Sequence, residues 1–358
     1  MDLFLSRTVS ISDATVTDTR RGHKRNISGI TWRRVTYRQI GMLISSLFLF
    51  VALHAQSKQH AQPGLQQQTL KADLGPCIKA GGFKMPGYIL WCPSVIKVGK
   101  TYHMFASRWP EKYGLAGWTK YSEIVRATSK SLYGPYTFQE IVLQKRPGCW
   151  DNDRAHNPKI IRAGGKYVLF YISSANETGY AYADKITGPW KRADRVILPF
   201  SNPAPLVMKD GSMYVFGRKV VDGLRTAQAY KASSFDGHYS LLAGGHNLLP
   251  AGNELEDPTI WWSHNRYNVL VSDFGGKATG ISKSGAQYYS KDGIHYTLLS
   301  KEPVYTKTVY YDDGGQFTFR RRERPFVYTD RSGVPEALFT ACLTASESSW
   351  IEVQRIKH

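Results

Sequence analysis

Residues 253–262 read NELEDPTIWW, with carboxylates up to a proline and an apolar run after it. Because proline cannot donate a hydrogen bond to a sheet ladder, it is typical of the first residue of a strand. The β-branched and aromatic residues after Pro258 predict a buried strand. The carboxylates before Pro258 are then expected at the mouth of that strand, where a propeller or barrel gathers side chains around one pocket.

The same arrangement, a pair of residues followed by a proline and a strand, recurs five times. The five pairs with their prolines are Trp91-Cys92-Pro93, His156-Asn157-Pro158, Ser201-Asn202-Pro203, Glu256-Asp257-Pro258 and Glu323-Arg324-Pro325. Each repeat continues with a hairpin turn and a second strand, and in the first four a third strand ends in a turn that precedes an aromatic residue. Four antiparallel strands repeated radially make a propeller blade.

The sequence therefore predicts an all-β fold, a five-bladed β-propeller with four-stranded antiparallel blades. The alternative is a β-sandwich with strands every 8–12 residues, and the repeated order of proline, strand and glycine turn argues against it. The last repeat shows three clear strands. Its fourth strand is expected from the stretch Cys77–Tyr88, or is missing.

The first part of the 358-residue chain is patterned for export. Residues 42–53 are apolar, too few for a bilayer span of about 20 residues. Arginines precede this run and His54-Ala55-Gln56 follows it, the layout of a secretory signal. We expect a leader at 1–55, a flexible linker at 56–76 and a single propeller domain at 77–358, in a periplasmic or secreted protein that does not stay inserted in a membrane after cleavage. A short membrane anchor is the alternative.

The net charge of +19 indicates an anionic partner, such as a sulfated or uronate-bearing glycan, or else a solvated basic surface. No nucleic-acid motif occurs, and with an export signal a nucleic-acid partner is not expected. The four cysteines, Cys77, Cys92, Cys149 and Cys342, lack metal-ligand spacing. Either Cys77 and Cys92 form a disulfide, or all four are small buried apolar residues. No metal site and no cofactor are predicted, with a structural cation in the central channel kept open.

The residues beside the five prolines are expected to line the mouth of the central channel. Glycoside hydrolysis needs one protonated carboxylic acid and one carboxylate, and indole rings stack on sugars. The candidate catalytic residues are Asp153, Glu256, Asp257 and Glu323, and the candidate substrate-binding residues are Trp91, Trp150, His156, Asn157, Asn202, Trp261, Asp273, Arg322 and Arg324. Structural roles stay open for them: a turn cap for Asp153, ion pairs with arginine for the other carboxylates, and a satisfied buried histidine for His156.

Several of these stretches resemble the five-bladed propeller glycoside hydrolases of families 43 and 117, and a family-117-like group of exported bacterial proteins in particular. They are Asp153–Pro158 with Ile160-Ile161, Ser201–Pro203, Glu256–Pro258 with Ile260-Trp261, Val271–Gly276 and Arg322–Pro325. The resemblance covers roughly residues 88–357 and implies exo-acting glycosidase activity. Family 43 enzymes carry an aspartate before the proline of blade one as general base, and here that residue is Cys92. Either a carboxylate of another blade, with Asp153 as the candidate, is the base, or the chain does not use that mechanism.

The sequence thus predicts an exported exo-acting glycoside hydrolase that removes a terminal sugar from a plant or algal polysaccharide or oligosaccharide. Two alternatives remain: a catalytically inactive carbohydrate-binding propeller, and a polysaccharide lyase that uses Tyr or His.

Overall fold

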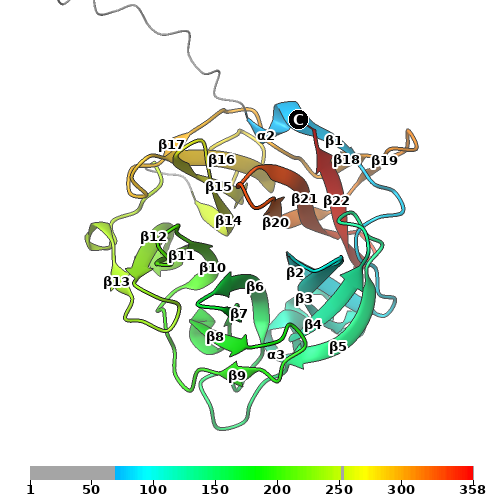
Figure 1. Ribbon diagram of the computed structural model, residues 1–358. Helices are drawn as coiled ribbons and strands as arrows, with labels where there is room; N and C mark the ends of the chain where they lie inside the picture. Colours follow the sequence, from blue (N-terminus) through cyan, green and yellow to red (C-terminus); the bar gives the residue numbers. More distant parts are fainter. Residues whose placement is uncertain (1–68, 251–253, 358) are drawn as a thin grey trace, which may run out of the picture. The chain divides into compact units, whose positions relative to one another are not determined.

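Five four-stranded antiparallel sheets are arranged around a central axis in the computed structural model, which describes residues 69–250 and 254–357 (Figure 1). Blade 1 contains β2 (Tyr88–Val98), β3 (Thr101–Pro110), β4 (Glu123–Ser129) and β5 (Thr137–Leu143). Blade 2 contains β6 (His156–Ala163), β7 (Lys166–Ile172), β8 (Thr178–Ala183) and β9 (Lys191–Arg192). Blade 3 contains β10 (Ser201–Val207), β11 (Met213–Val221), β12 (Leu224–Ala232) and β13 (Ser240–Leu241). Blade 4 contains β14 (Leu255–Ser263), β15 (Arg266–Asp273), β16 (Ser284–Ser290) and β17 (Thr297–Leu298).

Blade 5 is completed by a strand from the other end of the chain. It contains β20 (Arg321–Thr329), β21 (Pro335–Leu343), β22 (Ser349–Ile356) and, as its outer strand, β1 (Leu74–Cys77). β1 pairs antiparallel with β22, with Leu74 opposite Ile356. The fourth strand therefore ends where the expected stretch Cys77–Tyr88 begins, and residues 74–76 of the expected linker are strand residues. The five-bladed, all-β prediction is confirmed.

Short elements surround the blades. They are α2 (Leu70–Asp73), η1 (Glu111–Tyr113), η2 (Leu115–Gly117), α3 (Trp118–Tyr121), η3 (Ser174–Asn176), η4 (Ala243–Gly245) and the hairpin of β18 (Thr308–Tyr310) and β19 (Gln316–Thr318). No helix in the described part of the chain is long and apolar enough to cross a membrane. The expected leader and the linker up to residue 68 lie outside the described residues.

The residue before each repeated proline has a left-handed backbone conformation. Its φ is 56° at Cys92, 58° at Asn157, 54° at Asn202, 55° at Asp257 and 57° at Arg324. At each of these points the pairing register of the first hairpin shifts, as in a β-bulge. A left-handed residue other than glycine costs about 1–2 kcal/mol. Its fivefold recurrence means that the sheets impose it, and each bulge turns one side chain out of the regular alternation.

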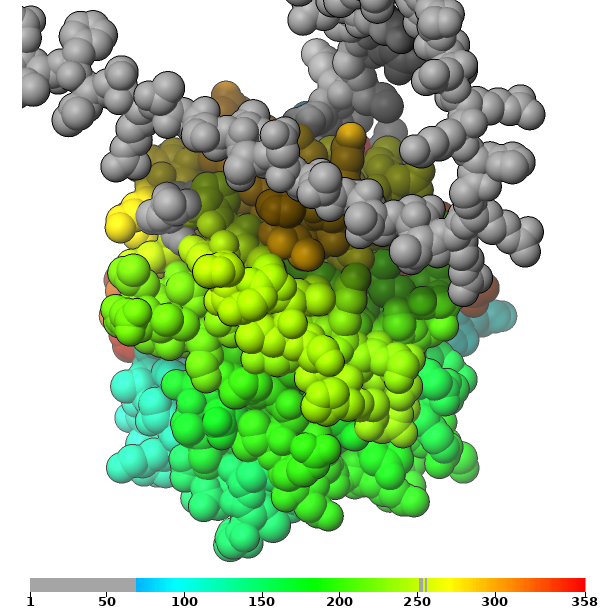
Figure 2. All heavy atoms as spheres, turned by 90° about the vertical axis from the view of Figure 1, so that its left-hand side faces the viewer, coloured from blue at the N-terminus to red at the C-terminus, as the bar shows by residue number. Residues whose placement is uncertain are grey.

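Aromatic side chains pack directly on glycines inside the blades. Phe200 covers Gly217 on β11, Trp150 covers Gly179 on β8, and a Cβ atom on either glycine would overlap the ring. Tyr305 lies on Gly285 of β16 in the same way. Figure 2 shows the flank of the molecule on which blade 3 and the loop after it face the viewer, in green and yellow-green.

Candidate functional site

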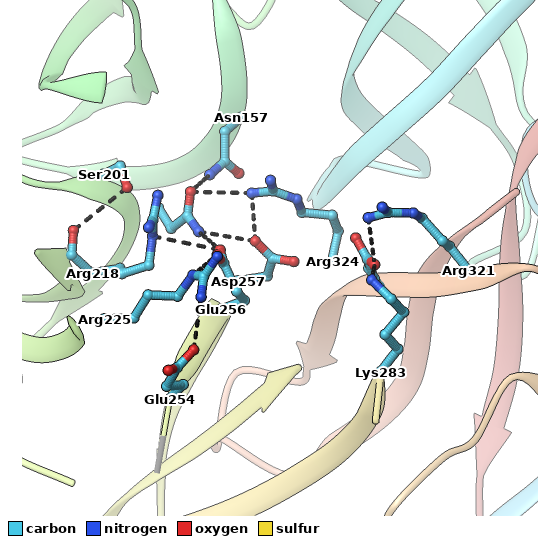
Figure 3. A network of polar contacts seen from close by, with 12 residues as sticks. Asn157, Ser201, Arg218, Arg225, Glu254, Glu256, Asp257, Lys283, Arg321 and Arg324 are labelled. Atoms are coloured by element: carbon cyan, nitrogen blue, oxygen red, sulfur yellow. Dashed lines mark hydrogen bonds and ion pairs between the residues drawn. The ribbon is translucent and has the colours of Figure 1, made fainter. Parts of the chain in front are cut away.

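The bulge residues of four neighbouring blades are joined by side-chain hydrogen bonds (Figure 3). Asn157 Nδ2 donates to Asn202 Oδ1 at 3.0 Å, and Asn202 Nδ2 donates to Asp257 Oδ1 at 2.9 Å. Arg324 Nη1 donates to Asn202 Oδ1 at 3.1 Å and lies 2.5 Å from Asp257 Oδ1. Because the bulges point these residues at one another, blades 2 to 5 contribute to a single polar layer at the mouth of the channel.

Two further carboxylates lie beside Asp257 on β14 and the loop before it. Glu256 accepts hydrogen bonds from Asn202 Nδ2 at 3.0 Å and Arg225 Nε at 2.7 Å. Arg218 Nε lies 3.5 Å from Glu256, and Arg225 Nη1 donates to Glu254 at 2.7 Å. Arg218 on β11 and Arg225 on β12 thus hold Glu256 from the neighbouring blade.

Glu323 on β20 has two cations of its own. Lys283 Nζ and Arg321 Nη1 each donate to Glu323 Oε1 at 3.1 Å. Lys283 also lies 4.1 Å from the centre of the Phe274 ring, and Arg225 lies 4.6 Å from the same centre. Phe274, which follows β15, therefore connects the cations around Glu256 with those around Glu323.

Cations outnumber carboxylates in this network. Among the described residues it contains five cationic side chains, Arg218, Arg225, Lys283, Arg321 and Arg324, and four carboxylates, Glu254, Glu256, Asp257 and Glu323. The buried Lys159, on β6 two residues after Asn157, adds a sixth cation, and burial lowers its pKa to about 8. The mouth is therefore electropositive although it is rich in carboxylates.

Asp257 is the most buried carboxylate of the network, because its side chain is 3% exposed against 7% for Glu323. Burial raises the pKa of Asp257 to about 7, Arg324 acts against this rise, and the nearby charges of Glu256 and Glu323 add to it. A carboxyl with this pKa is protonated for much of the time near neutral pH. Asp257 therefore has a pKa that suits a proton donor.

Blade 1 contributes a thiol and its histidine neighbour. Burial raises the pKa of Cys92 to about 11, so the thiol is neutral. Cys92 Sγ lies 3.6 Å from His156 Nε2, and Ser122 Oγ lies 2.8 Å from His156 Nδ1. Burial, together with Arg324 and Arg154, holds the pKa of His156 well below its usual range. Ser122 Oγ also donates to the carbonyl of Ala155. A neutral His156 that donates from Nδ1 to Ser122 and accepts at Nε2 from the thiol of Cys92 therefore satisfies all of these hydrogen bonds.

The structure brings together many of the residues predicted from the sequence. Glu256, Asp257, Glu323, Asn157, Asn202 and Arg324 form the network, and His156 adjoins it through Cys92. Asp153 lies apart from it. Its side chain is about half exposed, 3.8 Å from Arg154, in the connection between blades 1 and 2.

The remaining predicted residues have packing or capping contacts. Trp91 and Trp261 are buried in two different hydrophobic clusters. Trp150 Nε1 donates to the carbonyl of Ala193 at 2.8 Å. Asp273 accepts backbone N–H bonds from Ala278 and Thr279 after β15, and Arg322 donates to Thr340, Gln354 and the carbonyl of Thr306 around blade 5.

The sequence reasoning missed the cations Lys159, Arg218, Arg225 and Lys283. Most of the candidates were taken from beside the prolines, and Asp273 was the one candidate taken from a second strand, whereas the second and third strands of every blade also have an end at the mouth. Arg218 pairs in register with Ser201, next to the bulge of blade 3, and this position was a usable signal once the hairpin had been predicted.

The described residues form neither a cluster of metal-ligating side chains nor a disulfide at this site. In residues 69–250 and 254–357 no three His, Cys, Asp or Glu side chains gather in a way that could hold a metal ion. A cation in the channel would meet Arg324 and Lys159, which both lie close to Asp257 and Cys92. The four cysteines are free, with Cys77, Cys92 and Cys342 buried and Cys149 partly exposed.

Comparisons with known proteins give structural likenesses only. No family model and no curated protein matches the sequence. A solved structure described as a glycoside hydrolase superposes with a TM-score of 0.62 at 15% identity, covering 80% of this chain and 93% of its own. A family 117 glycoside hydrolase of the marine bacterium Zobellia galactanivorans superposes with a TM-score of 0.58 at 16% identity, covering 78% of this chain and 89% of its own.

A third structure is CoXyl43, a family 43 β-xylosidase/α-arabinofuranosidase from a compost microbial metagenome, in complex with xylotriose. It gives a TM-score of 0.57 at 13% identity, covering 79% of this chain and 96% of its own. At such low identity these likenesses establish the fold. The chain has the five-bladed β-propeller fold seen in glycoside hydrolases of families 43 and 117.

Proposed function

We propose that the protein is an exported exo-acting glycoside hydrolase that removes a terminal sugar from an acidic plant or algal polysaccharide or oligosaccharide. The observation that carries this proposal is the buried Asp257, whose pKa is raised to about 7, beside Glu256 and near Glu323 at the propeller mouth. The shared fold of known glycoside hydrolases supports it.

Asp257 is the proposed general acid. A protonated carboxyl gives its proton to the leaving glycosidic oxygen, and a pKa near the working pH makes this transfer efficient. Glu256 acts on Asp257 through its charge. The negative charge of Glu256, which is paired with Arg218 and Arg225, favours the protonated form of Asp257.

Glu323 is the proposed base that activates water. Lys283 and Arg321 both donate a hydrogen bond to Oε1 of this carboxylate. It lies on blade 5, next to the blade that carries Asp257, so the acid and the base come from separate strands. This assignment replaces the blade-one aspartate of family 43, for which the neutral thiol of Cys92 cannot substitute.

The exo mode of action is proposed from the resemblance of the sequence, and an acidic substrate suits the charge of the mouth. The hydrogen-bonded layer of Asn157, Asn202, Asp257 and Arg324 forms a polar floor across blades 2 to 5, on which the end of a chain can rest. The surplus of cations favours a sugar that carries a carboxylate or a sulfate. Export is proposed from the sequence of residues 1–55.

A carbohydrate-binding propeller without turnover is the second candidate. Two observations favour it: Cys92 occupies the blade-one position of the family 43 base, and each mouth carboxylate is bound to at least one cation. Such a protein would retain affinity for the same acidic glycan.

A product assay separates the two candidates. The purified protein is incubated with oligosaccharides of agar, carrageenan, ulvan, pectin and arabinan, next to Asp257→Asn, Glu323→Gln, Asp153→Asn and the rim control Glu254→Gln. We expect release of one terminal sugar, reduced about 10²–10⁴-fold in Asp257→Asn and Glu323→Gln and nearly unchanged in the other two. Release that disappears only in Asp153→Asn would move the base to Asp153. Binding without release by the wild type would identify the binding propeller.

A further inference from the structure

The face of the propeller opposite the mouth has a groove between blades 3 and 4. A cavity of about 590 Å³ lies between the β10–β11 turn, the end of β12 and the β14–β15 turn. We call it the opposite-face groove and define it by Met208, Lys209, Lys231, Trp262, Asn265 and Tyr267. Trp262 is the fifth residue after Asp257 along β14, so at about 3.3 Å per residue the groove lies about 17 Å from the mouth.

The polar side chains that define the groove make no hydrogen bond with the described residues, although Lys231 lies near the carboxylate of Asp210. Tyr267 is 5% exposed, and its hydroxyl makes no hydrogen bond with any residue of 69–250 or 254–357. The same holds for the side chains of Lys209, Lys231 and Asn265 and for the indole N–H of Trp262. The hydroxyl is not among the fully buried polar atoms that lack a partner, so it reaches the open groove, where a polar ligand can bind it in place of water.

The aromatic walls of the groove are held in place from behind. Trp262 packs edge-to-face on Tyr267 with ring centres 4.8 Å apart, and Tyr267 packs on Tyr214 at 4.7 Å. His264 and Asn265 both have positive φ, 51° and 53°, as in a type I′ turn, which fixes the hairpin that carries Trp262 and Asn265. The groove is therefore formed before any ligand arrives.

The charges of the groove favour an anion. Lys209 and Lys231 are exposed and form no ion pair within the described residues, whereas the one carboxylate of the lining, Asp210, accepts hydrogen bonds from Ser212 N and Oγ in its own turn. A half-buried indole, a tyrosine hydroxyl, an amide and two ammonium groups together match a sugar that carries an acidic group.

We propose that the opposite-face groove is a second glycan-binding site, specific for a saccharide unit that bears a carboxylate or a sulfate. It holds a remote part of the same polymer, or a neighbouring polymer chain, while the mouth acts on a chain end. This ligand class rests on the proposed function, but binding in the groove does not require turnover at the mouth. Two sites on one molecule raise the avidity for a polymer more than for a short oligosaccharide.

The test is affinity electrophoresis in gels that contain polygalacturonate for carboxylates, ι-carrageenan for sulfates or neutral arabinan. The full chain with Asp257→Asn serves as the background, so that no substrate is consumed. The double variant Lys209→Glu/Lys231→Glu is expected to bind the acidic polymer at least tenfold more weakly. The control is Lys100→Glu/Lys185→Glu, which makes the same change of charge on exposed turns of blades 1 and 2. Tyr267→Phe keeps the ring packing and is expected to weaken binding about three- to tenfold.

The outcomes separate the two proposals. In the Asp257→Asn background, the lysine double variant and Tyr267→Phe are both expected to be retarded less by the acidic polymer. In proteins with the native Asp257, the same substitutions are expected to leave the rate of hydrolysis of a short oligosaccharide at the wild-type value. Retardation that is unchanged in the groove variants, or equally reduced in the control, overturns the second site, as does retardation by duplex DNA but by none of the polysaccharides. Groove-dependent retardation without any hydrolysis by the wild type overturns the proposed function and leaves the groove as the binding site.

Discussion

Asp257 links the chemistry of the mouth to the stability of the protein. Its pKa is raised from 3.8 to about 7 in the folded state, so between these values the folded chain keeps a proton that the unfolded chain has released. The stabilising contribution is therefore fully present below about pH 4 and is lost as the pH rises through 7.

Asp257→Asn should weaken the pH dependence of the stability between about pH 4 and pH 7. The free energy of unfolding, measured with urea from pH 4.5 to pH 8, should decline less steeply with pH in the variant than in the wild type. Asp184→Asn, at an exposed aspartate paired with Lys166, serves as the control and should keep the wild-type slope. Equal slopes for Asp257→Asn and the wild type would contradict the raised pKa.

The cysteines differ in their reactivity. Burial raises the pKa of Cys92 to about 11 and of Cys77 to about 12, and it raises that of Cys342 well above its usual range. Thiolates are the reactive form, so these three should resist alkylation.

Native protein treated with iodoacetamide at pH 7.5 should thus be labelled only at the partly exposed Cys149, as read by mass spectrometry. Denatured protein should be labelled at all four cysteines without prior reduction. A need for reduction would indicate a disulfide, and rapid native labelling of Cys92 would show that the mouth exposes a reactive thiol.

At the scale of single elements, a glycine under an aromatic ring sets how closely strands and connections pack. Phe200, just before β10, occupies the space above Gly217 of β11. Gly217→Ala is expected to lower the free energy of unfolding by about 1–3 kcal/mol, because the added methyl overpacks the site. The double variant Gly217→Ala/Phe200→Leu makes room for that methyl. In urea titrations the two substitutions should therefore not be additive, and strict additivity would contradict the proposed clash.

The strand β1 closes the propeller by joining blade 5 to residues near the start of the described chain. It covers the edge of β22, and Leu70 and Leu74 pack into the cluster that contains Val327 and Leu338. A protein that starts at residue 78 should lose at least about 3 kcal/mol compared with one that starts at residue 69, since it exposes these side chains and an unpaired strand edge. Thermal denaturation of the two proteins measures the difference. Equal melting temperatures would show that β22 needs no outer strand.

At the scale of the whole molecule, the positive field of the mouth should appear in the kinetics. Its cations attract an acidic substrate from a distance, and the Debye length shrinks from about 10 Å at 0.1 M salt to about 3 Å at 1 M.

The KM for an acidic oligosaccharide should therefore rise several-fold between 50 and 500 mM NaCl, while the KM for a neutral analogue stays nearly constant. Arg225→Gln should reduce the salt dependence of the KM for the acidic oligosaccharide. It should leave the salt dependence of the KM for the neutral analogue unchanged. A salt effect of equal size on both substrates would argue against electrostatic attraction.

Many parts of the fold and of the site were predictable, because their signals are local. Asp257 and Asn202 could be placed at the mouth, since each stands beside a proline that must start a strand. Trp91, Trp150 and Trp261 were predicted to bind substrate from their type and position alone. In the structure these three indole rings pack in hydrophobic clusters, because burying their large apolar surface also stabilises the blades.

The repeated prolines, hairpin turns and aromatic residues by themselves determined the blades, their number and the five positions at the mouth, because strand and turn preferences act over a few residues. Only the tertiary structure decided that β1 completes blade 5 and that Arg218, Arg225 and Lys283 bind the mouth carboxylates. These contacts join residues of different blades or of separate strands. Their partners depend on which blades become neighbours and in which register, and no short stretch of sequence contains that information.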